Sequence, residues 1–309
     1  YMGFLDESRE LYERYGAPMI EARFPGYAAR IAAGLAGHGS ECFGFDDDIS
    51  RDHDLEPGFC LWIDEATDRE IGVELSRAYR ALPLERGGQR SALAEKSRGV
   101  RVISEFYRRY TGSPGAPESW QQWLHLPSYA LAEAVNGEVW RDDTGVFSAI
   151  RREIADGMPE DVRIKKLAAC AVSMAQSGQY NYSRCVKRGE NGAAMLALGE
   201  FVKSTAYMIH LLNRRHMPYY KWMLRSLDTL PRLGELRGAL EFLLTAENDD
   251  AGKETKTGVV EDICAALVRA LRADGLTCGN WDYMERHGLD MQGHIRNPAI
   301  RAEHILEGI

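Results

Sequence analysis

The uneven distribution of strand signals along the chain constrains its fold more than any other feature. Two short apolar runs, residues 58–63 and 99–103, have the character of buried strands, and both lie in the first third of the sequence. Residues 112–117, Gly-Ser-Pro-Gly-Ala-Pro, suit no regular element and are the best linker in the chain. Beyond the linker, almost every segment fits helical periodicity, namely residues 118–134, 143–156, 160–177, 190–213, 219–228, 231–246 and 254–273.

This contrast predicts an α+β protein with two domains. Residues 1–112 should form a small mixed sheet with helices, and residues 118–309 an all-α helical bundle. Within the first domain, residues 4–15 and residues 27–35 fit helices that precede a glycine-rich break at Gly37-His38-Gly39-Ser40.

Composition and charge exclude several classes of protein. A net charge of -8 gives no overall field that attracts a polyanion, so long nucleic acid is not the expected partner. The six cysteines lie far apart without a Cys-x-x-Cys pair, which indicates reduced thiols. The acidic start of the chain does not fit a signal peptide, and no apolar stretch is long enough to cross a bilayer. We expect a soluble, cytoplasmic protein without a membrane partner.

The informative stretch for chemistry runs from Gly39-Ser40 to Asp52-His53-Asp54. On an extended chain Asp52 and Asp54 lie on one face, and His53 lies on the other. Two unit charges roughly 4 Å apart repel by about 4 kcal/mol at an effective dielectric constant near 20, so the pair either shares a proton or binds a cation. Carboxylate oxygens suit Mg²⁺, and a glycine followed by a serine can approach and hold a phosphate. The pattern therefore predicts a site for a nucleoside triphosphate and its metal.

A Gly-Ser, a loop of about ten residues and an Asp-x-Asp before a strand resemble the polymerase-beta-like nucleotidyltransferase superfamily. The wider sequence also resembles a bacterial family of unknown function that is described only as nucleotidyltransferase-like. The stretches that carry this second resemblance are Phe43-Gly-Phe-Asp, Ser50-Arg-Asp-His-Asp, Pro57-Gly-Phe-Cys-Leu-Trp, Gln176-Ser-Gly-Gln-Tyr-Asn-Tyr and Pro218-Tyr-Tyr-Lys-Trp.

The resemblance implies an activity as well as a fold. Asp52 and Asp54 would hold one or two Mg²⁺ ions, Gly39 and Ser40 would bind the triphosphate, and an acceptor hydroxyl would attack its α-phosphate. The superfamily usually has a third carboxylate on a later strand. Here that strand reads Gly-Val-Arg-Val-Ile, with Arg101 where an acid is expected, and Glu105 is the substitute only if the strand continues that far.

A second group of candidate residues lies in the helical region. Gln176, Tyr180, Arg184 and Lys187 recur at i, i+4, i+8 and i+11, which on an α-helix gives a polar, aromatic and basic face suited to a nucleotide. The alternative is an ordinary exposed amphipathic face. A later helix repeats the pattern with Lys203, Tyr207, His210 and Arg214.

Two other functions stay open at this stage. Without a third carboxylate, the chain could be a nucleotide-binding or regulatory module that has lost catalysis, and a toxin-like enzyme that modifies RNA or protein is the other alternative. The acidic balance favours a small or cationic acceptor such as an aminoglycoside. The acidic run Asp46 to Asp48 lacks the pattern of a calcium loop, and helix capping or solvation is its expected role.

Overall fold

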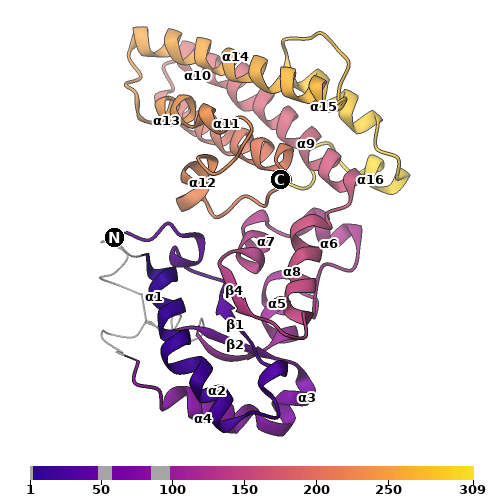
Figure 1. Cartoon of the computed structure of the whole chain (residues 1–309). Coiled ribbons are helices and arrows are strands. Elements are labelled where there is room, and N and C mark those ends of the chain that lie inside the picture. The colour runs from indigo at the N-terminus through magenta and orange to yellow at the C-terminus, as the bar shows by residue number, and fades with distance from the viewer. Residues whose placement is uncertain (1–2, 48–57, 85–97) are drawn as a thin grey trace. The chain divides into compact units, whose positions relative to one another are not determined.

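The computed structural model describes residues 3–47, 58–84 and 98–309, and these form two compact units (Figure 1). The first unit consists of residues 1–118 and 130–157, and the second of residues 119–129 and 158–309. The predicted division into domains 1–112 and 118–309 stays a prediction.

A four-stranded mixed sheet organises the first unit, with the strands in the order β3-β2-β1-β4. Strand β1 pairs antiparallel with both β2 and β4, whereas β2 and β3 are parallel. The strands are β1 (Ala32–Leu35), β2 (Cys60–Ile63), β3 (Gly99–Val102) and β4 (Glu138–Arg141). The two strands predicted in the first third are confirmed as β2 and β3, and the α+β fold class is confirmed with them.

The prediction of a helix over residues 27–35 was wrong. Only a short 3-10 turn, η2 (Ala28–Arg30), is helical, and the chain then becomes β1. All four residues of β1 are buried, so the strand shows no alternation of polar and apolar residues that could distinguish it from a helix. A Cβ at Gly34 would collide with the carbonyl of Glu138, so this residue has to be glycine for β1 and β4 to pair closely.

Strand β4 also departs from the almost wholly helical pattern predicted beyond residue 117. All four of its residues are partly exposed, as expected for an edge strand, and their apolar signal is weak. Gly137, which precedes the strand, has φ +67° and leaves no room for a side chain beside the carbonyl of Leu35.

Helices cover both faces of this sheet. Phe59, Leu61 and Ile63 pack with the N-terminal helices and α4 (Val73–Arg80). Trp62 instead faces α5 (Ile103–Thr111) and α8 (Val146–Asp156) and stacks on Phe147 at 4.0 Å. The helical elements of the unit are α1 (Phe4–Leu11), η1 (Tyr12–Gly16), α2 (Ala17–Arg23), η3 (Glu41–Phe43), α3 (Glu65–Thr67), η5 (Asp68–Gly72), α4 (Val73–Arg80), α5 (Ile103–Thr111), α7 (Ser128–Val135) and α8 (Val146–Asp156).

Among the described residues of the second unit, the regular elements are all helices, and they are built around α9 (Glu160–Met174), which packs against α11 (Asn191–Leu212) and α15 (Met284–Gly293). Small residues in α9 and Gly288 of α15 permit close approach, because a Cβ at Gly288 would lie 2.7 Å from the Val172 side chain. The remaining elements are α6 (Trp120–His125), η7 (Ala175–Tyr182), α10 (Ser183–Lys187), α11 (Asn191–Leu212), α12 (Tyr220–Leu227), η8 (Gly234–Leu236), α13 (Arg237–Thr245), α14 (Asp250–Ala273), α15 (Met284–Gly293) and α16 (Pro298–Ala302).

Two buried lysines of α9 bind backbone carbonyls of the segment 304–308. The Lys165 ammonium donates to the carbonyls of His304 and Ile305, and the Lys166 ammonium donates to those of Leu124 and Gly308. Burial lowers the pKa of each lysine to about 8.

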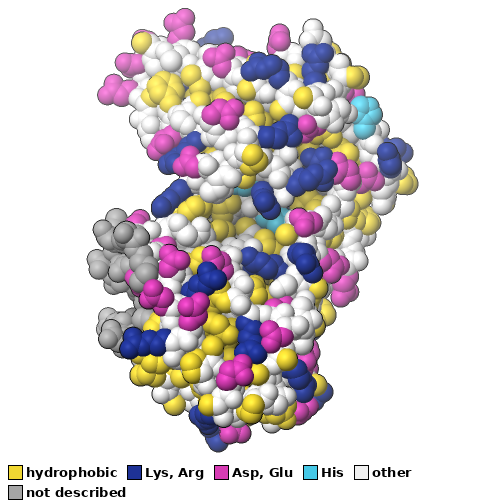
Figure 2. Space-filling view, in the orientation of Figure 1, with side chains coloured by type: hydrophobic (Ala, Val, Ile, Leu, Met, Phe, Trp, Pro, Cys, Tyr) yellow, Lys and Arg dark blue, Asp and Glu magenta, His cyan; other side chains and the backbone are white. Residues whose placement is uncertain are grey.

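On the face shown in Figure 2, acidic and basic side chains are interspersed over both units. Within the described ranges, no helix combines the length and apolar character needed to cross a membrane.

Candidate functional site

The glycine turn, residues Gly37 to Ser40, comes just after β1. It lies at the end of the sheet where β1 finishes and β2 begins, since Gly34 pairs with Cys60. Gly37 has φ +113° and Gly39 has φ +125°, backbone conformations that residues with a Cβ rarely adopt. The glycine-rich break predicted at these residues is therefore a defined turn in which two glycines have positive φ.

Asn136 fixes the start of this turn from 99 residues away. The Gly37 amide donates to Asn136 Oδ1 at 2.8 Å, and Asn136 Nδ2 donates to the Gly37 carbonyl at 2.7 Å. Arg151 of α8 in turn donates to the carbonyls of Asn136 and Gly137 at 2.6 and 2.9 Å. Both Gly37 and Asn136 are buried, and their hydrogen bonds to each other satisfy the polar groups that burial removes from water.

Glu41 packs beside Gly39. A Cβ at Gly39 would overlap the Glu41 carboxylate, which gives this position a second reason to be glycine. The carboxylate accepts a hydrogen bond from Arg98 at 2.5 Å, and both side chains are less than a tenth exposed. Burial raises the pKa of the neighbouring Cys42 and Cys60 thiols, so both stay protonated at neutral pH.

Ser40 connects the turn to η3. Its carbonyl accepts the amides of Phe43 and Phe45, both at 3.0 Å, which fixes the backbone beyond the serine. Asp46 is buried, and its carboxylate accepts the amide of Phe4 in the first turn of α1, 42 residues away. Asp52 and Asp54 lie outside the described residues, and their predicted role as metal ligands stays a prediction.

The candidate third carboxylate, Glu105, is not on a strand. Strand β3 ends at Val102, and Glu105 lies in the first turn of α5, so the alternation that was to place it beside the paired aspartates does not extend to it. Arg101 occupies the strand position, next to Trp62 of β2. The catalytic role of Glu105 remains a prediction without the strand geometry that motivated it.

A cavity of about 70 Å³ lies at the same sheet edge and brings Arg101 and Glu105 together. His38 of the glycine turn also lines it and pairs with Glu133 at 3.3 Å, and this hydrogen bond raises the pKa of His38. Its complete lining is Ala36, His38, Cys60, Arg101, Glu105, Phe106, Arg109 and Tyr110.

The helical candidates do not form the continuous α-helical face that was predicted. Residues 175–182 form the π-helix η7, in which the i, i+4 relation of an α-helix is lost. The structure brings Arg184 over the Tyr180 ring at 4.7 Å, and Gln176 and Lys187 are exposed. The nucleotide-binding role of these four residues stays a prediction.

Packing accounts for the neighbouring polar residues of this tract. Gly178 gives Phe201 of α11 room to pack, and the Tyr182 hydroxyl donates to Asn248 at 2.9 Å. Gln179 donates to Glu261 and to the carbonyl of Asp282 and accepts the amide of Met284. These contacts give Gly178, Gln179 and Tyr182 roles in packing and hydrogen bonding within the second unit.

The second predicted face is partly internal. Tyr207 and His210 are buried, whereas Lys203 and Arg214 are exposed. His210 Nδ1 lies 2.7 Å from the Ala206 carbonyl and Nε2 lies 2.8 Å from the Ser226 hydroxyl. Burial lowers the pKa of His210 to about 4, so it is a neutral core residue.

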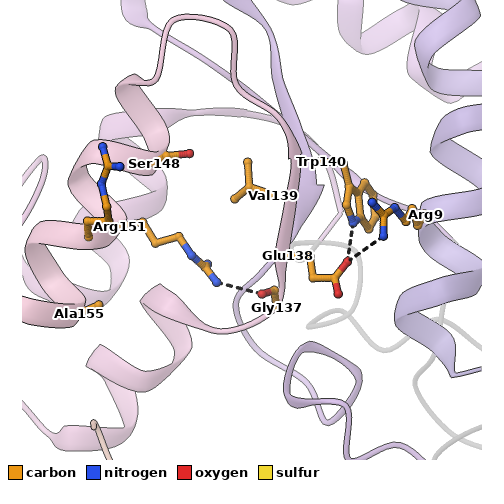
Figure 3. A pocket seen from close by; sticks show the side chains of 9 residues that line it. Arg9, Gly137, Glu138, Val139, Trp140, Ser148, Arg151 and Ala155 are labelled. Carbon is orange, nitrogen blue, oxygen red and sulfur yellow. Dashed lines mark hydrogen bonds and ion pairs between the residues drawn. The ribbon is translucent and has the colours of Figure 1, made fainter. Parts of the chain in front are cut away.

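A shallow hollow of about 510 Å³, which contains none of the predicted site residues, lies between β4 and α8 (Figure 3). The Glu138 carboxylate accepts the Trp140 indole N–H at 2.9 Å and pairs with Arg9 at 3.8 Å. Arg151 reaches the Gly137 carbonyl from the opposite wall, as Figure 3 shows. Two of its basic side chains are thus engaged by protein groups.

Sequence reasoning missed Asn136, Arg98 and Glu41. An Asn-Gly dipeptide at residues 136–137 is a turn signal, and it could have indicated the hairpin-like approach to β4. Nothing local marks Arg98 or Glu41. Within residues 3–47, 58–84 and 98–309, no group of three His, Cys, Asp or Glu side chains could hold a metal ion.

Comparison with known proteins gives two matches. Residues 123–223 match the family model described as a domain of unknown function (DUF4037). Over 92% of this chain and 81% of the other, the structure is distantly similar to a solved nucleotidyltransferase-like protein from Exiguobacterium sibiricum 255-15, with 12% identity and a TM-score of 0.38. No curated protein matches the sequence.

Proposed function

We propose that the protein is a Mg²⁺-dependent nucleotidyltransferase that moves a nucleoside monophosphate from a nucleoside triphosphate to an acceptor hydroxyl. The observation that carries the proposal is the glycine turn with its two left-handed glycines. It follows β1 at the edge where β2 begins, and Asp52-His53-Asp54 lies between these two strands in the sequence.

Each residue of the site has its own proposed role. The backbone of Gly39 and the Ser40 hydroxyl would hold phosphate oxygens, and Asn136 would keep the turn in shape. The carboxylates of Asp52 and Asp54 would hold Mg²⁺, since hard oxygen donors suit this ion. Bound Mg²⁺ would neutralise phosphate charge. The acceptor hydroxyl would lose its proton to solvent as its oxygen forms a bond to the α-phosphorus, the bond to the bridging oxygen would break, and pyrophosphate would leave.

The test uses Asp52→Asn combined with Asp54→Asn. The control combines Asp156→Asn and Asp262→Asn, two exposed acids on α8 and α14 that remove the same charge elsewhere. Pyrophosphate release is measured for each nucleoside triphosphate with a panel of metabolite and RNA acceptors, with Mg²⁺ and with EDTA. The proposal requires release that depends on Mg²⁺, disappears in the site variant and persists in the control. Equal rates in the two variants would remove the assignment.

A nucleotide-binding module without catalysis is the second candidate, and the sheet itself favours it. Arg101 stands on β3 where an acid was expected, Glu105 lies on a helix, and Glu41 is paired with Arg98. Calorimetry with each triphosphate separates the two functions, because the module would bind a nucleotide and release no pyrophosphate with any acceptor.

A further inference from the structure

Three exposed tyrosines of the second unit contact one another in series. Tyr219 and Tyr220, at the start of α12, are 48% and 70% exposed, and Tyr129, at the end of the segment 119–129, is 42% exposed. The centre of the Tyr219 ring lies 5.5 Å from that of Tyr129 and 4.4 Å from that of Tyr220. Aromatic rings gain much free energy from burial, so a cluster of exposed rings indicates an interaction surface.

Basic side chains continue this surface along α12. Lys221 is exposed, and its ammonium lies 5.5 Å from the centre of the Trp222 ring. The Arg225 guanidinium lies 5.8 Å from the centre of the same ring. Lys221 and Arg225 are four residues apart and therefore lie on one side of the helix. Among the residues that the structure describes, no acidic side chain forms a salt bridge with Lys221.

This part of the chain is basic although the whole chain is acidic. The second unit, residues 119–129 and 158–309, has 20 Lys and Arg against 19 Asp and Glu, so the net charge of -8 comes from the rest of the chain. Residues 203–227, which include α12, contain five Lys and Arg and no acid. Two of the five, Lys203 and Arg214, pair with acids outside this segment. The region around α12 can therefore attract an anion that the net charge of the whole chain would repel.

A single-stranded nucleic acid has the chemistry that this surface fits. Each nucleotide offers a flat base that can stack on an exposed ring and a phosphate that a basic side chain can bind. A duplex fits less well, because its bases already stack on one another. A bilayer also fits less well, because Met223, Leu224 and Leu227 of α12 pack into the core and leave the helix no apolar face to insert.

We propose that the second unit binds single-stranded nucleic acid through a surface made of Tyr129, Tyr219, Tyr220, Lys221 and Arg225. The rings stack on bases, and the two basic side chains bind phosphates. This surface does not rest on the proposed function, because binding requires neither the glycine turn nor a nucleoside triphosphate.

The test is the fluorescence anisotropy of a labelled RNA of about ten nucleotides, and of a DNA of the same sequence, with the full chain in EDTA. Tyr220→Leu keeps an apolar side chain but removes the ring, and we expect it to weaken binding about tenfold. Tyr220→Phe keeps the ring and should stay within about twofold of the unaltered protein. Leu196→Ala, at a 77% exposed position of α11, is the control for loss of an exposed apolar side chain and should not change the affinity.

A second pair of variants tests the phosphate contact. Lys221→Gln should weaken binding and make the affinity less dependent on salt, by the equivalent of about one phosphate contact. Arg269→Gln removes a positive charge from an exposed position of α14 and should change neither quantity.

Four results would overturn the nucleic-acid surface. These are equal binding by Tyr220→Leu and Tyr220→Phe, equal losses with Lys221→Gln and Arg269→Gln, no binding of either oligonucleotide by the unaltered protein at about 100 μM, and sedimentation with phosphatidylserine vesicles in place of oligonucleotide binding. The proposed function is judged separately. Oligonucleotide binding that requires the Tyr220 ring, with no pyrophosphate release from any triphosphate, keeps the surface and rejects the transferase. Pyrophosphate release by a protein that binds neither oligonucleotide does the reverse.

Discussion

Replacement of Asn136 by alanine should destabilise the first unit by removing both contacts that hold the glycine turn. The side chain makes two hydrogen bonds to Gly37, at 2.8 and 2.7 Å, and both residues are buried. A buried backbone group left without a partner costs about 1–3 kcal/mol. With two such groups, we expect the free energy of unfolding to fall by about 2–4 kcal/mol.

Asn136→Asp makes the prediction more specific. The aspartate keeps the acceptor for the Gly37 amide but directs a carboxylate oxygen at the Gly37 carbonyl, so its protonated form should fit better than its charged form. The folded state then raises the pKa of this carboxyl above its unfolded value, and the stability it contributes is present at low pH and lost as the pH rises through the folded pKa. As the pH falls from 7 to 5, the free energy of unfolding of Asn136→Asp should therefore rise relative to that of Asn136→Ala.

The assay is urea unfolding followed by circular dichroism, together with hydrogen exchange at the Gly37 amide. Asn181→Ala, at an exposed position of η7, is the control for an asparagine without a buried role. If Asn136→Ala unfolds within about 0.5 kcal/mol of the unaltered protein and the Gly37 amide keeps its protection, the two hydrogen bonds do not hold the turn.

Three further predictions concern stability. Gly39→Ala should lower the melting temperature more than Gly44→Ala: both glycines have positive φ, but only at Gly39 would the new Cβ overlap a carboxylate, and equal shifts would disprove that overlap. The pKa of His210 falls from 6.5 to about 4 on folding, so the unfolded state binds the proton more readily. As the pH falls from 7 to 4, the free energy of unfolding should therefore decrease by about 3 kcal/mol relative to that of a His210→Gln variant. Parallel denaturation curves for the two proteins over this range would contradict the burial of His210. Lys166→Met should release the segment around Gly308 and speed its cleavage by a protease, whereas Lys203→Met, at an exposed position, should not; equal cleavage rates would show that the Lys166 contacts do not retain this segment.

The elements that the sequence predicted well are those with strong local periodicity. The apolar run before Asp64 became β2, and the long helices of the second unit lie where helical spacing placed them. Strand β1 was mistaken for a helix because its four residues are buried on both faces and give no period of two. Strand β4 was missed because an edge strand carries too few apolar residues to stand out.

The site residues that escaped prediction act over long sequence distances. Asn136 contacts Gly37 across 99 residues, and Arg98 contacts Glu41 across 57. No local pattern encodes such a contact, since only the assembled sheet brings the two segments together. Periodicity failed in a different way at Gln176 and Tyr180, where a π-helix replaced the assumed α-helix and changed the angle between successive side chains.

The pairing of β1 with β4 also affects how the protein is made. A ribosome delivers β1 early, but its second hydrogen-bonding partner emerges only after α5, α6 and α7 have been synthesised. During that interval one side of β1 offers unpaired amides and carbonyls to any other nascent chain, a recognised route to aggregation. A truncated chain that stops near residue 112 would keep this exposed side permanently, and we expect such a fragment to precipitate.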